Sequence, residues 1–443
     1  MRQLFRTLTT VALAVSAALP AFAAAGDAPS VAPMPHVSWS RAANIYEVNI
    51  RQYTQEGTFK AFAQHLPRLK KMGVDILWLM PIQPIGEKNR KGTLGSYYAV
   101  RDYTAVNPEF GTLDDFKALV QQAHGLGMHV IIDWVANHTA FDNPWTKDHS
   151  DWYLKNDKGE IYPVTYTDGA EPEYWTDVTG LDWRQPGLWQ GMTDAMLYWV
   201  RATDIDGFRC DVAGKVPTPF WNQARAALDR VKPVFMLAEA DKPELHEHAF
   251  DMTYGWDTKD LFKAVAKGQA DARTLAGFVA HPPKAFPPGA YRMRFTSNHD
   301  ENSWAGSDTE LYGPAFKAMA VLAATLPGMP LIYGGQESGL DKRLAFFEKD
   351  PIAWKDYAYA PFYTDLLALK HANPALWNGQ YGAPVQVLAT GNDKVFAFRR
   401  SLGGNSVQVT VNVSNAPQRY TLPGAKARTL DAWDYRIDAP RRR

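Results

Sequence analysis

The sequence predicts an α/β protein built on a (β/α)8 (TIM) barrel, with a lobe inserted after the third strand and an antiparallel β-domain at the C-terminal end. Between about Trp39 and Asn373, apolar runs of strand length alternate with amphipathic helical runs, and eight of them are candidate strands. Residues 138–186 are rich in aromatic and acidic side chains and are too many for a plain βα loop. After residue 377, short strand-like runs with turns replace the helical runs. A doubly wound sheet, which shares the alternation, is the alternative fold.

The individual elements follow from hydrophobic periodicity. The barrel strands are expected at residues 44–50, 75–82, 128–135, 207–213, 234–240, 250–256, 291–300 and 329–335. Three of the helices between them are expected at residues 58–73, 112–127 and 188–202. The helix at 112–127 has the clearest start, because Thr112 and Asp115 stand at the spacing of a capping box. The strands of the C-terminal domain are expected at residues 385–391, 394–401, 406–414 and 418–424.

The first residues have the pattern of a secretory leader. Arg2 and Arg6 precede an apolar run, and Ala21-Phe22-Ala23 matches an A-x-A cleavage site. The run is too short for a comfortable transmembrane span, so we expect no membrane insertion. We therefore predict a cleavable signal peptide at residues 1–25 and a protein that is secreted or located in the periplasm.

Composition excludes some partners and allows a large core. The 443 residues carry 47 Lys and Arg against 47 Asp and Glu, without the basic stripe that nucleic acid would require. At 46% hydrophobic residues, the chain can bury one large core and a smaller second one. We expect a monomer. Its parts are a signal peptide at residues 1–25, a barrel formed by residues 26–137 and 187–377, a lobe inserted between them at residues 138–186, and a C-terminal β-domain at residues 378–443.

One candidate strand carries charges where a buried strand should be apolar. In "GFRCDVA", residues 207–213, Arg209 and Asp211 are two positions apart and share a face, whereas Cys210 points to the other face. Buried charges are costly unless they are paired or used. A structural ion pair is one interpretation of this strand, and a functional site is the other.

Polar residues recur where the candidate strands end, and this favours a functional site. Barrel enzymes place their chemistry at the C-terminal ends of the strands. Four of the strands carry the following candidates: Asp133, Asn137 and His138; Arg209 and Asp211; Glu239; His299 and Asp300. Solvation or helix capping accounts for one such residue, but not for the whole set.

The same stretches resemble a known family. "DWVANH", "GFRCDVA", "MLAEA" and "FTSNHD" are similar, in order and in strand position, to the four signature regions of the α-amylase superfamily of glycoside hydrolases. "GVDILWLMPI", "GSYYAVRDYTAVNPEFGT" and "GMPLIYGGQE" resemble the family's second strand, the loop after it and its eighth strand. The resemblance covers nearly the whole mature chain and implies the fold given above, with activity on α-glucosidic bonds.

The resemblance also implies catalytic roles. Asp211 is expected to be the nucleophile that forms a glycosyl-enzyme, and Glu239 the general acid/base. Asp300 is expected to bind sugar hydroxyls and stabilise the transition state. Arg209 would keep Asp211 ionised and oriented, with Asp133 as structural support of the site.

Substrate-binding roles and a metal site are implied in the same way. His138 and His299 match residues that donate to hydroxyls of the cleaved sugar, and Tyr98 matches the aromatic residue that stacks on it. Asn137 matches a position that often binds a structural calcium, although the first βα loop, "RQYTQEGTF", lacks the aspartates that bind calcium in some relatives. We expect no catalytic cofactor.

The expected function is that of a secreted, retaining hydrolase of starch, maltodextrin or malto-oligosaccharides. The bond that we expect it to cleave is the α-1,4-glucosidic bond. A transglycosylase that uses the same site, or an α-glucosidase for short oligosaccharides, is the alternative. A barrel that only binds carbohydrate is the alternative from another class, but such relatives usually lose the nucleophile or the acid, and all three carboxylates are present here.

Overall fold

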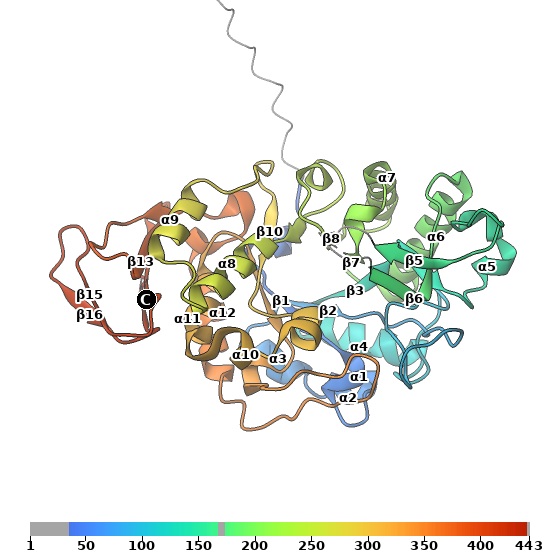
Figure 1. Cartoon of the computed structure of the whole chain (residues 1–443), viewed down its shortest axis with the longest axis horizontal. Helices are drawn as coiled ribbons and strands as arrows, with labels where there is room; N and C mark the ends of the chain where they lie inside the picture. Colours follow the sequence, from blue (N-terminus) through green and yellow to red (C-terminus); the bar gives the residue numbers. More distant parts are fainter. Residues whose placement is uncertain (1–34, 167–172, 441–443) are drawn as a thin grey trace, which may run out of the picture. The chain divides into compact units, whose positions relative to one another are not determined.

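The computed structural model describes residues 35–166 and 173–440, so the predicted signal peptide lies outside the described residues. Eight parallel strands close into a barrel (Figure 1). In chain order they are β1 (Ile45–Val48), β2 (Ile76–Leu79), β3 (His129–Val135), β7 (Gly207–Asp211), β8 (Phe235–Ala238), β9 (Met252–Tyr254), β10 (Tyr291–Arg294) and β11 (Met329–Tyr333). Every strand lies within a predicted run. The barrel is therefore confirmed, and the doubly wound sheet is wrong, because β1 pairs with both β2 and β11.

The barrel strands separate two apolar regions. Side chains such as Ile45, Trp78 and Leu237 fill the barrel interior, and a larger core lies between the strands and the surrounding helices. On β7 the alternation is as predicted, because Cys210 joins the outer core. Arg209, its neighbour in sequence, is buried at 0% exposure on the inner side, where it contacts Asp133 of β3.

The helices around the barrel follow the predicted pattern with one correction. α4 (Leu113–Gly125) begins with the predicted capping box of Thr112 and Asp115, and α6 is Pro186–Thr203. The single helix expected at 58–73 is wrong. It is divided into α2 (Phe59–Ala63) and α3 (Leu66–Met72), because Pro67 cannot continue the ladder of α2 and starts a new helix instead. The others are α1 (Ile50–Tyr53), α5 (Trp145–Asp148), α7 (Thr218–Asp229), α8 (Trp256–Ala266), α9 (Ala272–Ala280), α10 (Asp308–Tyr312), α11 (Phe316–Thr325) and α12 (Ala360–Ala372).

Two antiparallel regions accompany the barrel (Figure 1). After β3, a three-stranded sheet consists of β4 (His138–Ala140), β6 (Glu173–Gly180) and β5 (Pro163–Tyr166). Near the C-terminus, β12 (Gln386–Val387), β13 (Val395–Leu402), β14 (Asn405–Asn412) and β17 (Tyr435–Asp438) form a four-stranded sheet, and β15 (Gln418–Tyr420) pairs with β16 (Arg428–Leu430). The sequence analysis missed β16 and β17, which are short and follow Pro/Gly-rich and acidic turns.

Candidate active site

A cavity of about 730 Å³ opens at the C-terminal ends of the barrel strands. Its walls come from the segments that follow β2, β7, β8, β9, β10 and β11 and from the inserted sheet. Six of the predicted site residues line it: Tyr98, His138, Asp211, Glu239, His299 and Asp300. Arg209 and Asp133 lie beneath the cavity, both at 0% exposure, and complete the set.

Arg209 connects the acidic groups of the site. Its Nη1 donates to Asp133 Oδ1 at 2.9 Å and to Asp211 Oδ1 at 3.0 Å. Its Nη2 lies 2.9 Å from Glu239 Oε1, as an ion pair rather than an aligned hydrogen bond. Its Nε donates to the Tyr254 hydroxyl at 3.1 Å. Three carboxyl groups from β3, β7 and the end of β8 thus share one guanidinium.

This sharing changes the acidity of the carboxyl groups. Burial raises the pKa of Asp211 well above its usual range, and the Glu239 carboxylate raises it further, while Arg209 opposes both. Burial likewise raises the pKa of Asp133 to about 6 against the opposing effect of Arg209. Arg209 thus favours the ionised form of Asp211, as the sequence analysis expected, but burial and the neighbouring carboxylate outweigh it.

Glu239 is fixed by the backbone next to Asp211. The Val212 N–H donates to Glu239 Oε2 at 2.7 Å. Val212 has φ 43° and ψ 36°, a left-handed conformation that β-branched residues rarely adopt. The surrounding structure must offset this strain, which is of the kind often found at functional sites. The turn after β7 therefore directs an amide toward the carboxylate at the end of β8.

A second network of hydrogen bonds and ion pairs lies on the side of the cavity that contains Tyr98. The Tyr98 hydroxyl donates to Asp133 Oδ2 at 3.1 Å and lies 2.7 Å from His299 Nε2. His299 Nε2 is also 3.4 Å from Asp300 Oδ2, and its Nδ1 is 2.6 Å from Glu47 Oε1. The Asp300 side chain is 44% exposed, so of the acidic residues named here it is the one most open to a ligand.

His138 is held as a neutral donor. Burial lowers the pKa of His138 to about 4. The Asn137 amide lies with its Nδ2 3.2 Å from His138 Nδ1, so Nδ1 accepts and the ring proton is on Nε2. His138 lines the cavity, and its ring also hydrogen-bonds to the Tyr98 backbone, so a ligand hydroxyl would have to share or replace that contact.

The predicted calcium position has other contacts. Asn137 Nδ2 also lies 3.1 Å from the Tyr166 hydroxyl. Within residues 35–166 and 173–440, no three His, Cys, Asp or Glu side chains form a group that could hold a metal ion. Calcium at Asn137 stays a prediction from the resemblance, and no chemical step below depends on it.

Several site residues were missed by the sequence analysis. Trp78 donates from Nε1 to Asp133 Oδ2 at 3.2 Å, and Tyr254 binds Arg209. Glu47 binds His299 from the first strand. A carboxylate in the middle of the apolar run "IYEV" is the same signal that identified Arg209 and Asp211, and it could have identified Glu47.

The outer part of the cavity has an aromatic wall and an ion pair. Trp304 lies on the π-helical turn η5 (Glu301–Ala305), with its ring centroid 5.2 Å from that of Phe346 and 6.0 Å from that of Phe347. Lys91 Nζ lies 3.2 Å from Asp177 Oδ1 and joins the loop after β2 to the inserted sheet. All five residues line the cavity, which supplies both flat apolar faces and charged hydrogen-bonding groups.

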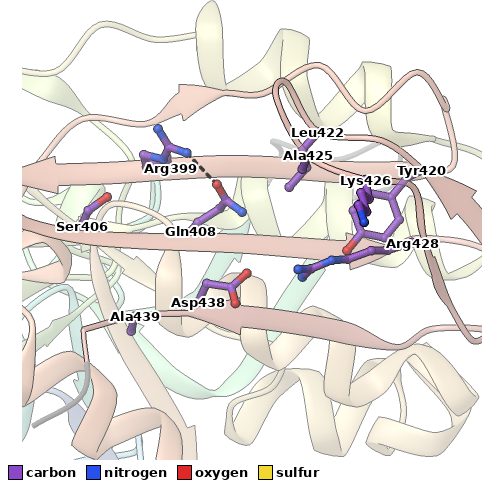
Figure 2. A pocket seen from close by; sticks show the side chains of 10 residues that line it. All are labelled: Arg399, Ser406, Gln408, Tyr420, Leu422, Ala425, Lys426, Arg428, Asp438 and Ala439. Carbon is purple, nitrogen blue, oxygen red and sulfur yellow. Dashed lines mark hydrogen bonds between the residues drawn. The ribbon is translucent and has the colours of Figure 1, made fainter.

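A second cavity, of about 430 Å³, belongs to the C-terminal domain (Figure 2). Figure 2 shows Arg399 of β13 joined by a hydrogen bond to Gln408 of β14. Lys426, Arg428 and Asp438 also line this cavity. None of the predicted site residues does so, and the chemistry derived below belongs to the cavity at the barrel.

The curated relatives of this chain include α-amylases and maltosyltransferases. The family model described as alpha amylase, catalytic domain, matches residues 40–263, just over half of the chain. The α-amylase MalA of Haloarcula japonica is 29% identical over 420 residues, which are 90% of this chain and 59% of the relative. The α-1,4-glucan:maltose-1-phosphate maltosyltransferase of Rhodospirillum rubrum is 30% identical over 407 residues, 83% of this chain and 56% of the relative. The chain thus spans less than two thirds of the length of these two relatives.

Solved structures agree with this grouping. An α-amylase from Lactobacillus plantarum is 30% identical with a TM-score of 0.80, over 91% of this chain and 99% of that one. The maltogenic α-amylase AmyB from Thermotoga neapolitana is 29% identical with a TM-score of 0.77, over 90% of this chain and 96% of that one. With the family model, the closed barrel and the acidic cluster at its C-terminal end, the chain belongs to the α-amylase family of glycoside hydrolases.

Proposed function

We propose that this protein is a retaining hydrolase that cleaves α-1,4-glucosidic bonds of starch, maltodextrin or malto-oligosaccharides through a covalent glycosyl-enzyme. The observation that carries the proposal is the position of Asp211 and Glu239 on one guanidinium, that of Arg209, at the wall of one cavity. This proximity supports a nucleophile and an acid that act on one sugar.

The reaction takes two displacements. In the first, an Asp211 oxygen bonds to the anomeric carbon while Glu239 gives its proton to the glycosidic oxygen, so the leaving chain departs as an alcohol. In the second, the Glu239 carboxylate removes a proton from water, whose oxygen bonds to the anomeric carbon and releases Asp211 as a carboxylate. Both residues end in the state in which they began.

The contacts of the two carboxyl groups support retention of configuration. Inverting enzymes keep their carboxyl groups about 6.5–9.5 Å apart to hold a water molecule, whereas retaining enzymes keep them about 5–5.5 Å apart. Asp211 and Glu239 each lie within 3.0 Å of a nitrogen of the same guanidinium group. The Val212 N–H, next in the chain to Asp211, also donates to Glu239 Oε2 at 2.7 Å, and these contacts together favour the shorter separation.

The other residues bind the sugar on which this chemistry occurs. His138 offers its Nε2–H, and Asp300 offers a partly exposed carboxylate to sugar hydroxyls. Tyr98 is fixed by Asp133 and His299, so its ring is a rigid face for the sugar that is cleaved. Trp304 and Phe346 supply apolar faces further out.

Transfer to a sugar hydroxyl in place of water is the second candidate, favoured by the maltosyltransferase named above. Product chromatography separates the two reactions. Hydrolysis of maltoheptaose gives only shorter chains, whereas transfer also gives longer ones. The same assay with starch, pullulan, maltose, isomaltose and sucrose identifies the bond that is cleaved.

Asp211→Asn and Glu239→Gln test the roles directly. Each should lower kcat on maltoheptaose by at least about 1,000-fold, because each removes a group that forms or breaks a bond in the transition state. Asp157→Asn, at an exposed position, is the matched control and should keep full activity. Activity of either site variant within tenfold of the unmodified protein would show that the roles are wrong, and a complete lack of activity in the unmodified protein would favour a barrel that only binds carbohydrate.

We also propose export to the periplasm or the medium, supported by the leader pattern at residues 1–25. None of the helices in residues 35–166 and 173–440 combines the length and apolar character that a membrane span needs. N-terminal sequencing of the protein from the periplasmic and medium fractions should give a new N-terminus near Ala24 to Gly26. A cytoplasmic protein that keeps Met1 would contradict export. Size-exclusion chromatography with light scattering tests the predicted monomer.

A further inference from the structure

Glu47 is a buried carboxylate that does not line the cavity. It lies on β1 at 0% exposure, and its Oε1 is 2.6 Å from His299 Nδ1. Its other oxygen has no hydrogen-bond partner among the described residues. A carboxylate in this environment is costly unless its one contact is strong, so the contact with His299 is the reason to look for a role.

The hydrogen-bond contacts of His299 indicate its protonation state. The Tyr98 hydroxyl has one proton and donates it to Asp133 Oδ2. Its oxygen, 2.7 Å from His299 Nε2, must then accept a hydrogen from that nitrogen. Nδ1 faces a carboxylate, Glu47, which accepts as well. With these donations both ring nitrogens carry hydrogen, so the geometry favours an imidazolium at His299.

The surrounding charges favour the same state. Burial would lower the pKa of His299, but the carboxylates of Asp300 and Glu47 outweigh it and raise the pKa to about 9. Burial raises the pKa of Glu47, and His299 and Arg209 oppose this. Six other titratable or charged groups face Glu47 and His299. Asp133, Arg209, Tyr254 and Tyr333 lie on the strands β3, β7, β9 and β11. Tyr98 lies in the loop after β2, and Asp300 lies in the loop after β10.

We infer that Glu47 is a positioning residue that holds the His299 ring in one orientation and as a cation, so that its Nε2–H can only donate. This inference rests on the proposed function for the identity of the ligand. A sugar hydroxyl that bridges His299 Nε2 and Asp300 Oδ2, now 3.4 Å apart, must share or take over the hydrogen that Nε2 gives to Tyr98, and it must donate its own hydrogen to the carboxylate. Glu47 thereby determines which partner donates and which accepts in the hydrogen bonds that bind one hydroxyl of the cleaved sugar.

Glu47→Gln is the sharpest test, since it keeps the shape of the side chain and removes the charge. Nitrogen-15 NMR of the imidazole rings, with His299→Gln used to assign the signal, follows the titration of His299 without any substrate. In the unmodified protein the ring should stay protonated up to about pH 9. In Glu47→Gln it should lose its proton at lower pH, because a negative partner has been removed.

Kinetics then tests the consequence for the reaction. Glu47→Gln should lower kcat/KM on maltoheptaose about 10- to 100-fold, the size expected when a hydrogen bond to a charged group is lost. The loss should be larger at pH 8 than at pH 6, because the neutral ring is more populated at the higher pH. Glu47→Asp, which keeps the charge on a shorter side chain, should regain part of the activity.

Glu337→Gln is the matched control. Glu337 is also buried at a barrel strand end, but it binds the Tyr46 hydroxyl and Arg68 and does not contact His299. It should leave both the titration of His299 and the pH dependence unchanged, whatever it does to stability. If Glu47→Gln and Glu337→Gln give the same titration and the same pH profile, Glu47 has only a structural role and the inference is wrong. An unmodified protein that lacks glycosidase activity but shows the shifted titration would contradict the proposed function and leave the protonation of His299 established.

Discussion

At the scale of single residues, charges inside apolar strands carried the most information. Arg209 and Asp211 were identified because a buried strand has no reason to contain them unless they are paired or used. The same reasoning applied to Glu47 would have marked it, but its partner His299 lies 252 positions away and becomes a neighbour only when the barrel closes. The residues of the site could therefore be predicted from the sequence more readily than their contacts.

The charge of Asp211 should cost stability. Its pKa is raised in the folded protein by burial and by Glu239, so the folded state binds a proton more tightly than the unfolded state does. The folded protein is thus penalised as pH rises above the unfolded pKa, and no penalty exists below it. Asp211→Asn should raise Tm at pH 7 by at least about 2 °C, and the gain should vanish near pH 4.

Thermal unfolding of the two proteins between pH 4 and pH 8 measures this effect. Asp157→Asn removes an exposed carboxylate and should change Tm by less than about 1 °C at every pH. A Tm for Asp211→Asn that is lower than that of the unmodified protein at pH 7 would show that Arg209 more than offsets the burial of this carboxylate.

At the scale of elements, local signals predicted boundaries well where they were strong. Thr112 and Asp115 gave the start of α4 within one residue. The apolar periodicity of residues 58–73 continued through Pro67, and the restriction that proline places on the backbone outweighed it. β17 could not be predicted, because its four residues are too few for a clear strand pattern and it is a strand only through its pairing with β14.

Trp304, on the turn η5, leads to a prediction about substrate binding. Trp304 is 55% exposed at the cavity wall and lies beside Phe346 and Phe347, so together they offer an apolar patch to a ligand. Trp304→Ala should raise KM for maltoheptaose about fivefold through the loss of about 1 kcal/mol of stacking, with kcat within about twofold. Tyr174→Ala, which removes an aromatic ring that is 61% exposed and outside the cavity wall, should change neither constant. A fall in kcat at constant KM would instead mean that Trp304 acts on the transition state.

At the scale of the whole molecule, the C-terminal sheet is part of the same folding unit as the barrel. Phe396 and Phe398 of β13 and Val409 of β14 belong to the large core that surrounds the barrel. The barrel, the inserted sheet and the C-terminal sheet, as far as residues 35–166 and 173–440 describe them, form one compact unit. The change of pattern after residue 377 predicted the sheet, whereas the sequence held no signal for how it is attached.

Arg400 makes that attachment, and its replacement should destabilise the whole unit. At 1% exposure, it donates from Nε to the Ala383 carbonyl at 2.8 Å, from Nη1 to that of Thr325 at 3.0 Å and from Nη2 to that of Trp377 at 3.3 Å. Thr325 is the last residue of α11, so one side chain of the C-terminal sheet ties down the end of a barrel helix. Arg400→Met keeps the apolar stem but leaves three carbonyls without this donor, which should cost about 2–4 kcal/mol and lower Tm by about 2–5 °C.

The neighbouring Arg399 provides the control for this prediction. It points to the other face of β13, is exposed and binds Gln408 on the next strand, so Arg399→Met should lower Tm by less than about 1 °C. Because the barrel cavity contains no atom of Arg400, kcat of Arg400→Met at 25 °C should equal that of the unmodified protein. Two separate unfolding transitions in Arg400→Met would mean that the sheet and the barrel unfold independently, and equal Tm values for the two arginine variants would mean that the three carbonyls find other donors.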